Sequence, residues 1–206
     1  MSDVFKIAGD FTSHYEDESG KFFNPERNTW TAYPDSLASG LPTVGPGLTG
    51  TLGGQNIVAG QEYPANLIDD EYKIRSQEDY DLLSRNLGEQ WGQYNPNQQA
   101  SVMSLMHNVG SGNLLKSKAF GHLKEGNLEG FTHEAFDPEI GFVKAEQGGV
   151  AIPGLVRRRA AEKDLFNKSW NSTNTQPVDD LNQNFEDPVN KLFSDNEKVN
   201  SAFTTK

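Results

Sequence analysis

The sequence predicts an α+β protein: an N-terminal helix, a small antiparallel β-hairpin lobe and a larger helical lobe. Three observations predict this order. Apolar residues recur at steps of three or four from Val4 to Glu18, a turn-rich stretch follows at residues 28–58, and helical periodicity returns at Ser76. We expect a cleft between the two lobes, where an elongated ligand commonly binds.

The first predicted helix carries a single apolar stripe made of Val4, Ala8, Phe11 and Tyr15. Ser19-Gly20 is expected to end it, because glycine readily adopts the left-handed conformation that follows a helix. The next segment is dense in turn formers, with short Thr, Trp, Tyr and Val runs between them. A small antiparallel sheet with tight turns is therefore predicted over residues 28–58.

The helical lobe is predicted from caps and apolar spacing. Ser76 is expected to be the N-cap of a helix that stops at Gly88. The next predicted helix begins at Asn97 and ends at residues 108–110. Further helices are predicted over residues 113–124, 127–136 and 155–166. Arg157 to Arg159 are expected to form a structural ion pair with Glu162.

The chain has 206 residues, which suffice for one domain and an appended tail. We expect the domain at residues 1–167. Residues 168–206 are rich in Asn, Ser, Thr, Asp and Lys, so they predict a polar tail, extended or partly disordered. The protein is expected to be a monomer.

Composition excludes several classes of function. The net charge of −11 argues against nucleic acid as a partner. The chain has no cysteine, and its four histidines lack metal-ligand spacing, so no metal or other cofactor is expected. No apolar run is long enough to span a membrane. Residues 1–11 lack the features of a signal peptide, which predicts synthesis in the cytoplasm.

The carboxylates near the N-terminus suit glycosidic bond cleavage, which usually takes one protonated and one ionised carboxyl group. The group comprises Glu16, Asp17, Glu18, Glu26 and Asp35. Glu18 continues the apolar stripe, and burial would raise its pKa as a proton donor requires. Glu16 is expected to lie off that stripe, behind Thr12.

Three further blocks carry recognisable motifs. The first is Tyr33-Pro34-Asp35, Gly40, Pro42-Thr43-Val44-Gly45, Gly47 and Thr49. The second is Gln99, Ala100, Leu105 and His107-Asn108-Val109-Gly110, and the third is Gly154-Leu155-Val156-Arg157-Arg158-Arg159 with Glu162. In this order they resemble the hairpin, central helix and terminal helix of phage lysozymes, glycoside hydrolase family 24.

This resemblance implies a lysozyme-like fold and a role for each site residue. The proton donor would be Glu18 or Glu16, at the end of the first helix. Asp35 would be the second carboxylate, and the Thr43 hydroxyl would help to hold the attacking water. Family members usually invert the anomeric configuration, which requires carboxyl groups about 6.5–9.5 Å apart.

The chain departs from the family in the spacing of these site residues. The family's glutamate usually precedes the aspartate by nine residues, whereas Glu18 and Glu16 precede Asp35 by 17 and 19. Glu26 has the usual spacing but follows Asn24-Pro25 rather than a helix, so it ranks third. The segment from Asp35 to Thr43 is also longer than usual, and Leu48 stands where many members have histidine.

The resemblance implies an N-acetylmuramidase that cleaves the β-1,4 bond between N-acetylmuramic acid and N-acetylglucosamine in bacterial peptidoglycan. It would serve phage-mediated host lysis or wall penetration. It would reach the wall either after release by a holin or as part of a virion. In a virion, other phage proteins would contact the tail at 168–206. Glu18-Ser19 also resembles the signature of lytic transglycosylases, which would use Glu18 alone. The third hypothesis is a non-catalytic virion component on a lysozyme scaffold.

Overall fold

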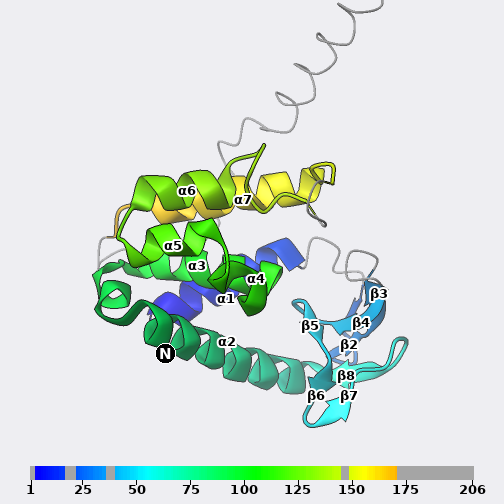
Figure 1. The fold of residues 1–206 in the computed structure, drawn as a ribbon. Coiled ribbons are helices and arrows are strands. Elements are labelled where there is room, and N and C mark those ends of the chain that lie inside the picture. The colour runs from blue at the N-terminus through cyan, green and yellow to red at the C-terminus, as the bar shows by residue number, and fades with distance from the viewer. Residues whose placement is uncertain (1–2, 17–21, 36–39, 145–148, 171–206) are drawn as a thin grey trace, which may run out of the picture.

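The structure is a computed structural model that describes residues 3–16, 22–35, 40–144 and 149–170. Figure 1 shows small sheets on one side and a cluster of helices on the other, with one long helix running between them. The predicted α+β class and the predicted order of lobes are confirmed.

The helices make up most of the described chain. They are α1 (Asp3–Glu16), α2 (Ala65–Leu87), the 3-10 helix η1 (Gly88–Gln93), α3 (Pro96–Val109), α4 (Ser111–Leu115), α5 (Lys118–Lys124), α6 (Leu128–Phe136) and α7 (Pro153–Asn167). The strands separate helix α1 from the other helices in sequence. In space, α1 nevertheless belongs to the helical lobe, where it packs against α3.

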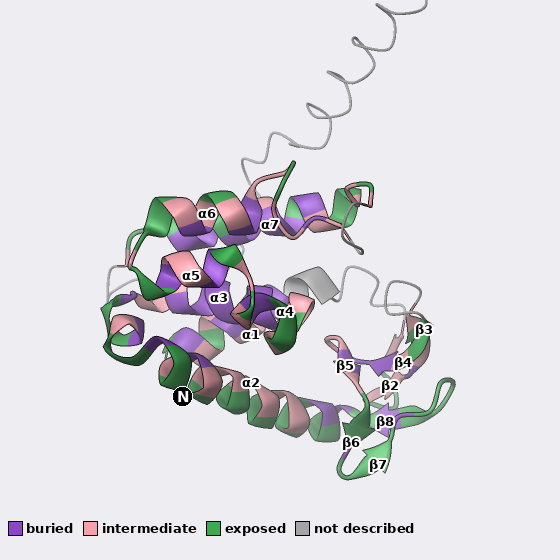
Figure 2. Ribbon diagram, viewed as in Figure 1, coloured by how far each residue is buried: buried purple, intermediate pink, exposed green. Residues whose placement is uncertain are grey.

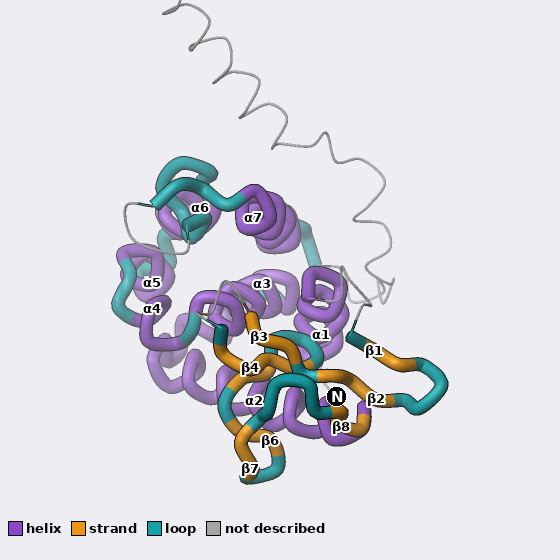
Figure 3. The backbone as a smooth tube through the Cα atoms, turned by 90° about the vertical axis from the view of Figure 1, so that its right-hand side faces the viewer, coloured by secondary structure: helices purple, strands orange, loops and turns teal. Residues whose placement is uncertain are grey.

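The strands are short and form three antiparallel sheets (Figure 3). They are β1 (Phe23–Asn24), β2 (Thr29–Thr31), β3 (Tyr33–Asp35), β4 (Leu41–Val44), β5 (Leu48–Thr49), β6 (Thr51–Leu52), β7 (Gln55–Asn56) and β8 (Glu62–Pro64). The sheet orders are β1-β2-β8, β3-β4-β5 and β6-β7. Strands therefore cover a longer stretch than the predicted 28–58.

Each lobe has its own core, and Figure 2 shows the buried residues on its inward faces. The helical core includes Phe11, Trp91 and Phe166. The core of the sheet lobe consists of Ala32, Val44, Leu48, Leu52, Ile57, Tyr63 and Ile68.

Helix α2 connects the two cores. Ile68 near its start belongs to the sheet-lobe core, whereas Leu83 and Leu87 near its end belong to the helical core. The prediction that Ser76 caps a helix is wrong, because Ser76 lies in the middle of α2. The true start follows Pro64, which makes no side-chain capping bond and so leaves no N-cap signal in the sequence.

Other boundaries differ by smaller amounts. Helix α3 begins at Pro96, where Asn95 forms a capping box with Gln98, one residue before the predicted start at Asn97. The single helix predicted over 113–124 is two helices, because α4 ends at Leu115 and Ser117 then caps the start of α5. Gly88 ends α2 as predicted.

A buried ion cluster attaches α7 to α3. Glu162 is fully buried, and its Oε1 accepts hydrogen bonds from Ser104 Oγ at 2.7 Å, Arg158 Nε at 3.2 Å and Arg159 Nη2 at 3.1 Å. Arg159 Nε lies 2.8 Å from the other carboxylate oxygen. Ser101 Oγ donates to the Glu162 backbone carbonyl at 2.7 Å. The predicted structural ion pair with Glu162 is therefore confirmed for Arg158 and Arg159, whereas Arg157 is exposed on the same helix.

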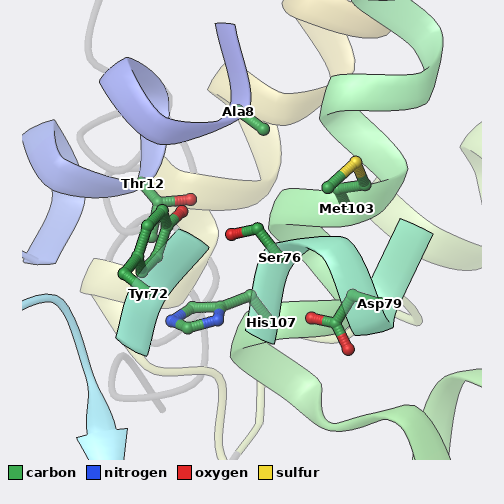
Figure 4. Close-up of a pocket in the computed structure, with 7 residues that line it drawn as sticks. All are labelled: Ala8, Thr12, Tyr72, Ser76, Asp79, Met103 and His107. Carbon is green, nitrogen blue, oxygen red and sulfur yellow. The ribbon is translucent and has the colours of Figure 1, made fainter. Parts of the chain in front are cut away.

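A small polar cavity of about 10 Å³ lies where α1, α2 and α3 meet (Figure 4), with room for a single water molecule. The fully buried Thr12 hydroxyl lines it and has no hydrogen-bond partner among the described residues. Asp79 lines it from α2. Burial, reinforced by nearby Glu78 and opposed by Arg75, raises the pKa of Asp79 from 3.8 to about 6.

Glu162→Gln should destabilise the fold by about 3–5 kcal/mol, because it leaves two buried guanidinium groups without a carboxylate. Arg157→Gln is the matched control, because Arg157 is exposed on the same helix. It should change the free energy of unfolding by less than about 0.5 kcal/mol. Urea denaturation followed by circular dichroism measures both, and wild-type stability of the Glu162 variant would contradict this account.

Asp79→Asn should stabilise the protein at pH 7.5 by roughly 1–2 kcal/mol, after allowance for solvent screening. The pKa of Asp79 is higher in the folded state, so the folded state binds more protons between pH 4 and 6. The contribution of Asp79 to the free energy of unfolding of the wild-type protein therefore falls as the pH rises through that window. The gain from asparagine should shrink toward pH 4, and denaturation at both pH values tests this. A loss of stability at pH 7.5 would contradict the burial cost.

Candidate active site

Asp35 and Thr43 lie on neighbouring strands of the β3-β4-β5 sheet. Tyr33 pairs with Thr43, and Asp35 pairs with Leu41. Directly paired residues in an antiparallel sheet share a face, and so do residues two apart on one strand. Asp35 and Thr43 are therefore diagonal neighbours on one face, a separation of about 7–8 Å that long side chains or one water can bridge.

Thr43 is almost completely buried, with 1% of its surface exposed. Its hydroxyl donates a hydrogen bond to the Leu41 carbonyl at 3.2 Å, which fixes the side-chain rotamer. A hydroxyl that donates in this way still has acceptor lone pairs. Thr43 can therefore accept a hydrogen bond from a water molecule and hold that water in a defined orientation.

Asp35 is the last residue of β3 and is half-buried. The Gly40 amide donates to the Asp35 backbone carbonyl at 2.7 Å, which closes the enlarged loop between β3 and β4. Gly40 has a positive φ of 79°, which explains the glycine at the end of that loop. Opposite Asp35, the Leu41 side chain is 53% exposed, so an apolar surface lies beside the carboxylate.

Phe22, the first described residue after α1, packs beside Tyr33. The ring of Phe22 stacks on Tyr33 with centroids 4.2 Å apart and planes inclined by 12°. The Thr31 amide donates to the Phe22 carbonyl at 2.8 Å. These contacts fix where the chain from α1 enters the sheet lobe, two residues before Asp35 along β3. Sequence reasoning did not identify Phe22.

The turn between β4 and β5 packs tightly against α2. Gly45 has a φ of 57°, and a Cβ there would lie 2.5 Å from Ile68 Cγ2, so only glycine fits. On the other side of this turn, His107 Nε2 of α3 lies 2.9 Å from the Pro46 carbonyl oxygen. Gly45 of the hairpin motif thus serves its packing against α2.

Arg75 attaches the next part of the sheet lobe to α2. Its guanidinium donates to the Thr49 carbonyl at 2.9 Å and to the Thr51 carbonyl, and its Nε pairs with Glu71 at 2.9 Å. Sequence reasoning missed this residue. The four-residue spacing of Glu71 and Arg75 was the available signal, because it is typical of an exposed helix.

Helix α1 ends at Glu16, and Glu18 lies outside the described residues. The preference for Glu18 assumed that Thr12 lies off the buried stripe. Thr12 is fully buried, so that assumption is wrong and the stripe gives no ground for preferring Glu18. Glu26 is exposed in the turn between β1 and β2.

In Figure 1, the C-terminal end of α1 lies on the side of the helical lobe that faces the sheets. That placement suits a proton donor opposite Asp35. Neither the cavity at Thr12 nor a hollow lined by Ser117 and Glu134 includes Asp35 or Thr43. The cleft between the lobes therefore stays a prediction.

Within the described residues, no group of three or more His, Cys, Asp or Glu side chains is arranged to hold a metal ion. In the same part of the chain, no helix is both long and apolar enough to cross a membrane. Helix α7 ends at Asn167, and Asn97 Nδ2 donates to the carbonyl oxygens of Lys168 and Ser169 at 3.2 and 3.4 Å. The predicted tail lies mostly outside the described residues.

Solved structures of two lysozyme-like proteins resemble this one. An endolysin from the Escherichia coli O157:H7 phage FAHEc1 superposes with a TM-score of 0.54 at 20% identity, over 80% of this chain and 93% of that chain. The muramidase domain of SpmX from Asticaccaulis excentricus gives 0.56 at 20% identity, over 79% and 95%. These matches confirm the predicted lysozyme-like fold. No curated protein sequence matches the chain.

The phage lysozyme family model matches residues 26–162, which is more than half of the chain. The matched range includes Asp35 and Thr43 and does not reach Glu16 or Glu18. It also covers the central helix and the buried Glu162 cluster. The chain therefore belongs to the phage lysozyme family, a family of peptidoglycan hydrolases.

Proposed function

We propose that the protein is an N-acetylmuramidase that hydrolyses the β-1,4 bond between N-acetylmuramic acid and N-acetylglucosamine, with inversion at the anomeric carbon. One observation carries the proposal: Asp35 and Thr43 share a face of the β3-β4 ladder, within the range that the family model matches. The proton donor is a glutamate at the end of α1, assigned to Glu18, with Glu16 as the competing assignment.

The proposed reaction is a single displacement. The protonated glutamate donates its proton to the glycosidic oxygen as the bond to the anomeric carbon breaks. A water molecule held by Asp35 and the Thr43 hydroxyl attacks the same carbon from the opposite face, and Asp35 accepts the proton that this water loses. The exposed Leu41 side chain beside Asp35 provides an apolar surface for a sugar ring.

Asp35→Asn should lower the rate of peptidoglycan hydrolysis by about 10²–10⁴-fold, because the amide cannot accept the proton of the attacking water. Thr43→Val should also reduce the rate, whereas Thr43→Ser, which keeps the hydroxyl, should retain most of it. Asp70→Asn, an exposed carboxylate on α2, is the matched control. Turbidity loss of purified bacterial walls measures the rates, and circular dichroism checks folding.

The products distinguish this reaction from its alternatives. Mass spectrometry should find reducing muramic acid ends released by the wild-type protein. Anhydro-muramyl ends would instead indicate transglycosylation by one glutamate. Wall binding without released sugar would indicate a non-catalytic scaffold, and full activity of Asp35→Asn would contradict the site.

Glu18→Gln and Glu16→Gln identify the proton donor. We expect Glu18→Gln to abolish hydrolysis of walls and Glu16→Gln to leave most of it, because only the donor must release a proton to the leaving oxygen. The reverse pattern would transfer the role to Glu16. Both variants should unfold at the wild-type temperature, which thermal melts verify.

We place this activity in phage-mediated host lysis or wall penetration. The polar composition of residues 168–206 supports a contact with virion or tail proteins, because a lysozyme fold is complete without it. Co-sedimentation of the protein with intact particles distinguishes a virion component from an enzyme that a holin releases.

A further inference from the structure

We propose that His107 is a positioning residue that fixes the hairpin turn following Thr43 relative to the helical lobe. The inference rests on the proposed function for its catalytic consequence. The contact itself rests only on the structure. His107 is part of the central-helix motif, but neither the sequence nor the comparisons assign it a role.

The contact joins two lobes that are far apart in the sequence. His107 lies in the last turn of α3, and Pro46 lies in the turn between β4 and β5. The distance from His107 Nε2 to the Pro46 carbonyl oxygen is 2.9 Å, which is typical of a hydrogen bond. Proline has no amide hydrogen, so the carbonyl is the only backbone polar group that Pro46 offers.

The chemistry of the two groups determines which of them donates the hydrogen bond. A carbonyl oxygen can only accept, so Nε2 of His107 must carry the proton. Both the imidazolium and the neutral tautomer protonated on Nε2 satisfy this requirement. The bond therefore needs a side chain that places an N–H group at this position, and an apolar side chain of similar size cannot replace it.

Helix packing holds the His107 ring in place. The ring lies edge-on to Tyr72 of α2, with centroids 5.5 Å apart and planes inclined by 69°. It also lines the polar cavity shown in Figure 4, beside Ser76 and Asp79. The ring thus lies at the junction of α2, α3 and the hairpin, where a small displacement of its partner changes the relation of the lobes.

Pro46 is coupled to Thr43 through a short, tightly packed piece of chain. Val44 and Leu48 flank the turn as a ladder pair, and both are fully buried. Gly45 contacts Ile68 so closely that the turn cannot move toward α2. His107 holds the turn from the α3 side. Loss of this hydrogen bond therefore removes a polar contact between the hairpin and α3, while Ile68 and Arg75 still hold the sheet lobe against α2.

Distances between the lobes test the contact without reference to activity. The chain has no cysteine, so Gln55→Cys and Glu129→Cys, both exposed and one in each lobe, introduce the only two labelling sites. Spin-label distance measurements should give a narrow distribution in the otherwise wild-type protein. His107→Leu should broaden it, and His107→Gln, whose amide donates from a similar position, should restore it.

Kinetics on soluble glycan fragments test the consequence. His107→Leu should lower kcat by about 10-fold or more and change KM by less than about 2-fold, because misplaced Thr43 and Asp35 affect the reacting centre rather than binding. His107→Gln should recover most of kcat. His133→Leu, at an exposed position on α6, is the control and should match the wild type in both measurements.

The outcomes separate the two proposals. An unchanged distance distribution in folded His107→Leu would overturn the positioning role, whatever the activity. Equal defects in His107→Leu and His107→Gln would also overturn it, because they would indicate a packing role for the ring. A wild-type protein that is inactive on all glycans, with distances that still respond to His107, would overturn the proposed function and leave the contact established.

Discussion

The arrangement of the lobes depends on one constraint: a single helix takes part in both hydrophobic cores. Helix α2 contributes Ile68 to the sheet-lobe core and Leu83 and Leu87 to the helical core. Its 23 residues span about 34 Å at the usual rise per residue. The sheets are too short to form a stable lobe by themselves, so they rely on the first turns of this helix.

The sequence predicted elements well where local signals and tertiary packing agree. The apolar stripe of α1 is confirmed at Val4, Ala8 and Phe11, and Gly88 ends α2 as expected. The first half of α2 was missed for a physical reason. Much of it faces solvent between the lobes, so it lacks a wide apolar stripe, and Pro64 supplies no capping side chain.

The site was predictable to the extent that it is local. Asp35 and Thr43 belong to one hairpin, and strand alternation places them on one face once the β3-β4 register is known. The contacts that hold the hairpin could not be predicted, because Arg75 and His107 donate to backbone carbonyls of distant residues. Every residue has a backbone carbonyl, so the hairpin sequence does not indicate which of its carbonyls binds a distant side chain.

The position of α1 has a consequence for how the protein folds during synthesis. This helix is made before the sheets and the other described helices, yet its buried residues pack in the same core as Phe166, near the end of α7. The sheet lobe is therefore an insertion within the helical lobe. Contacts between such distant segments form slowly, because a long loop must close first. The core cannot be completed until α7 has left the ribosome, so the end of α1 and Asp35 acquire their final relation only after α7 has been made.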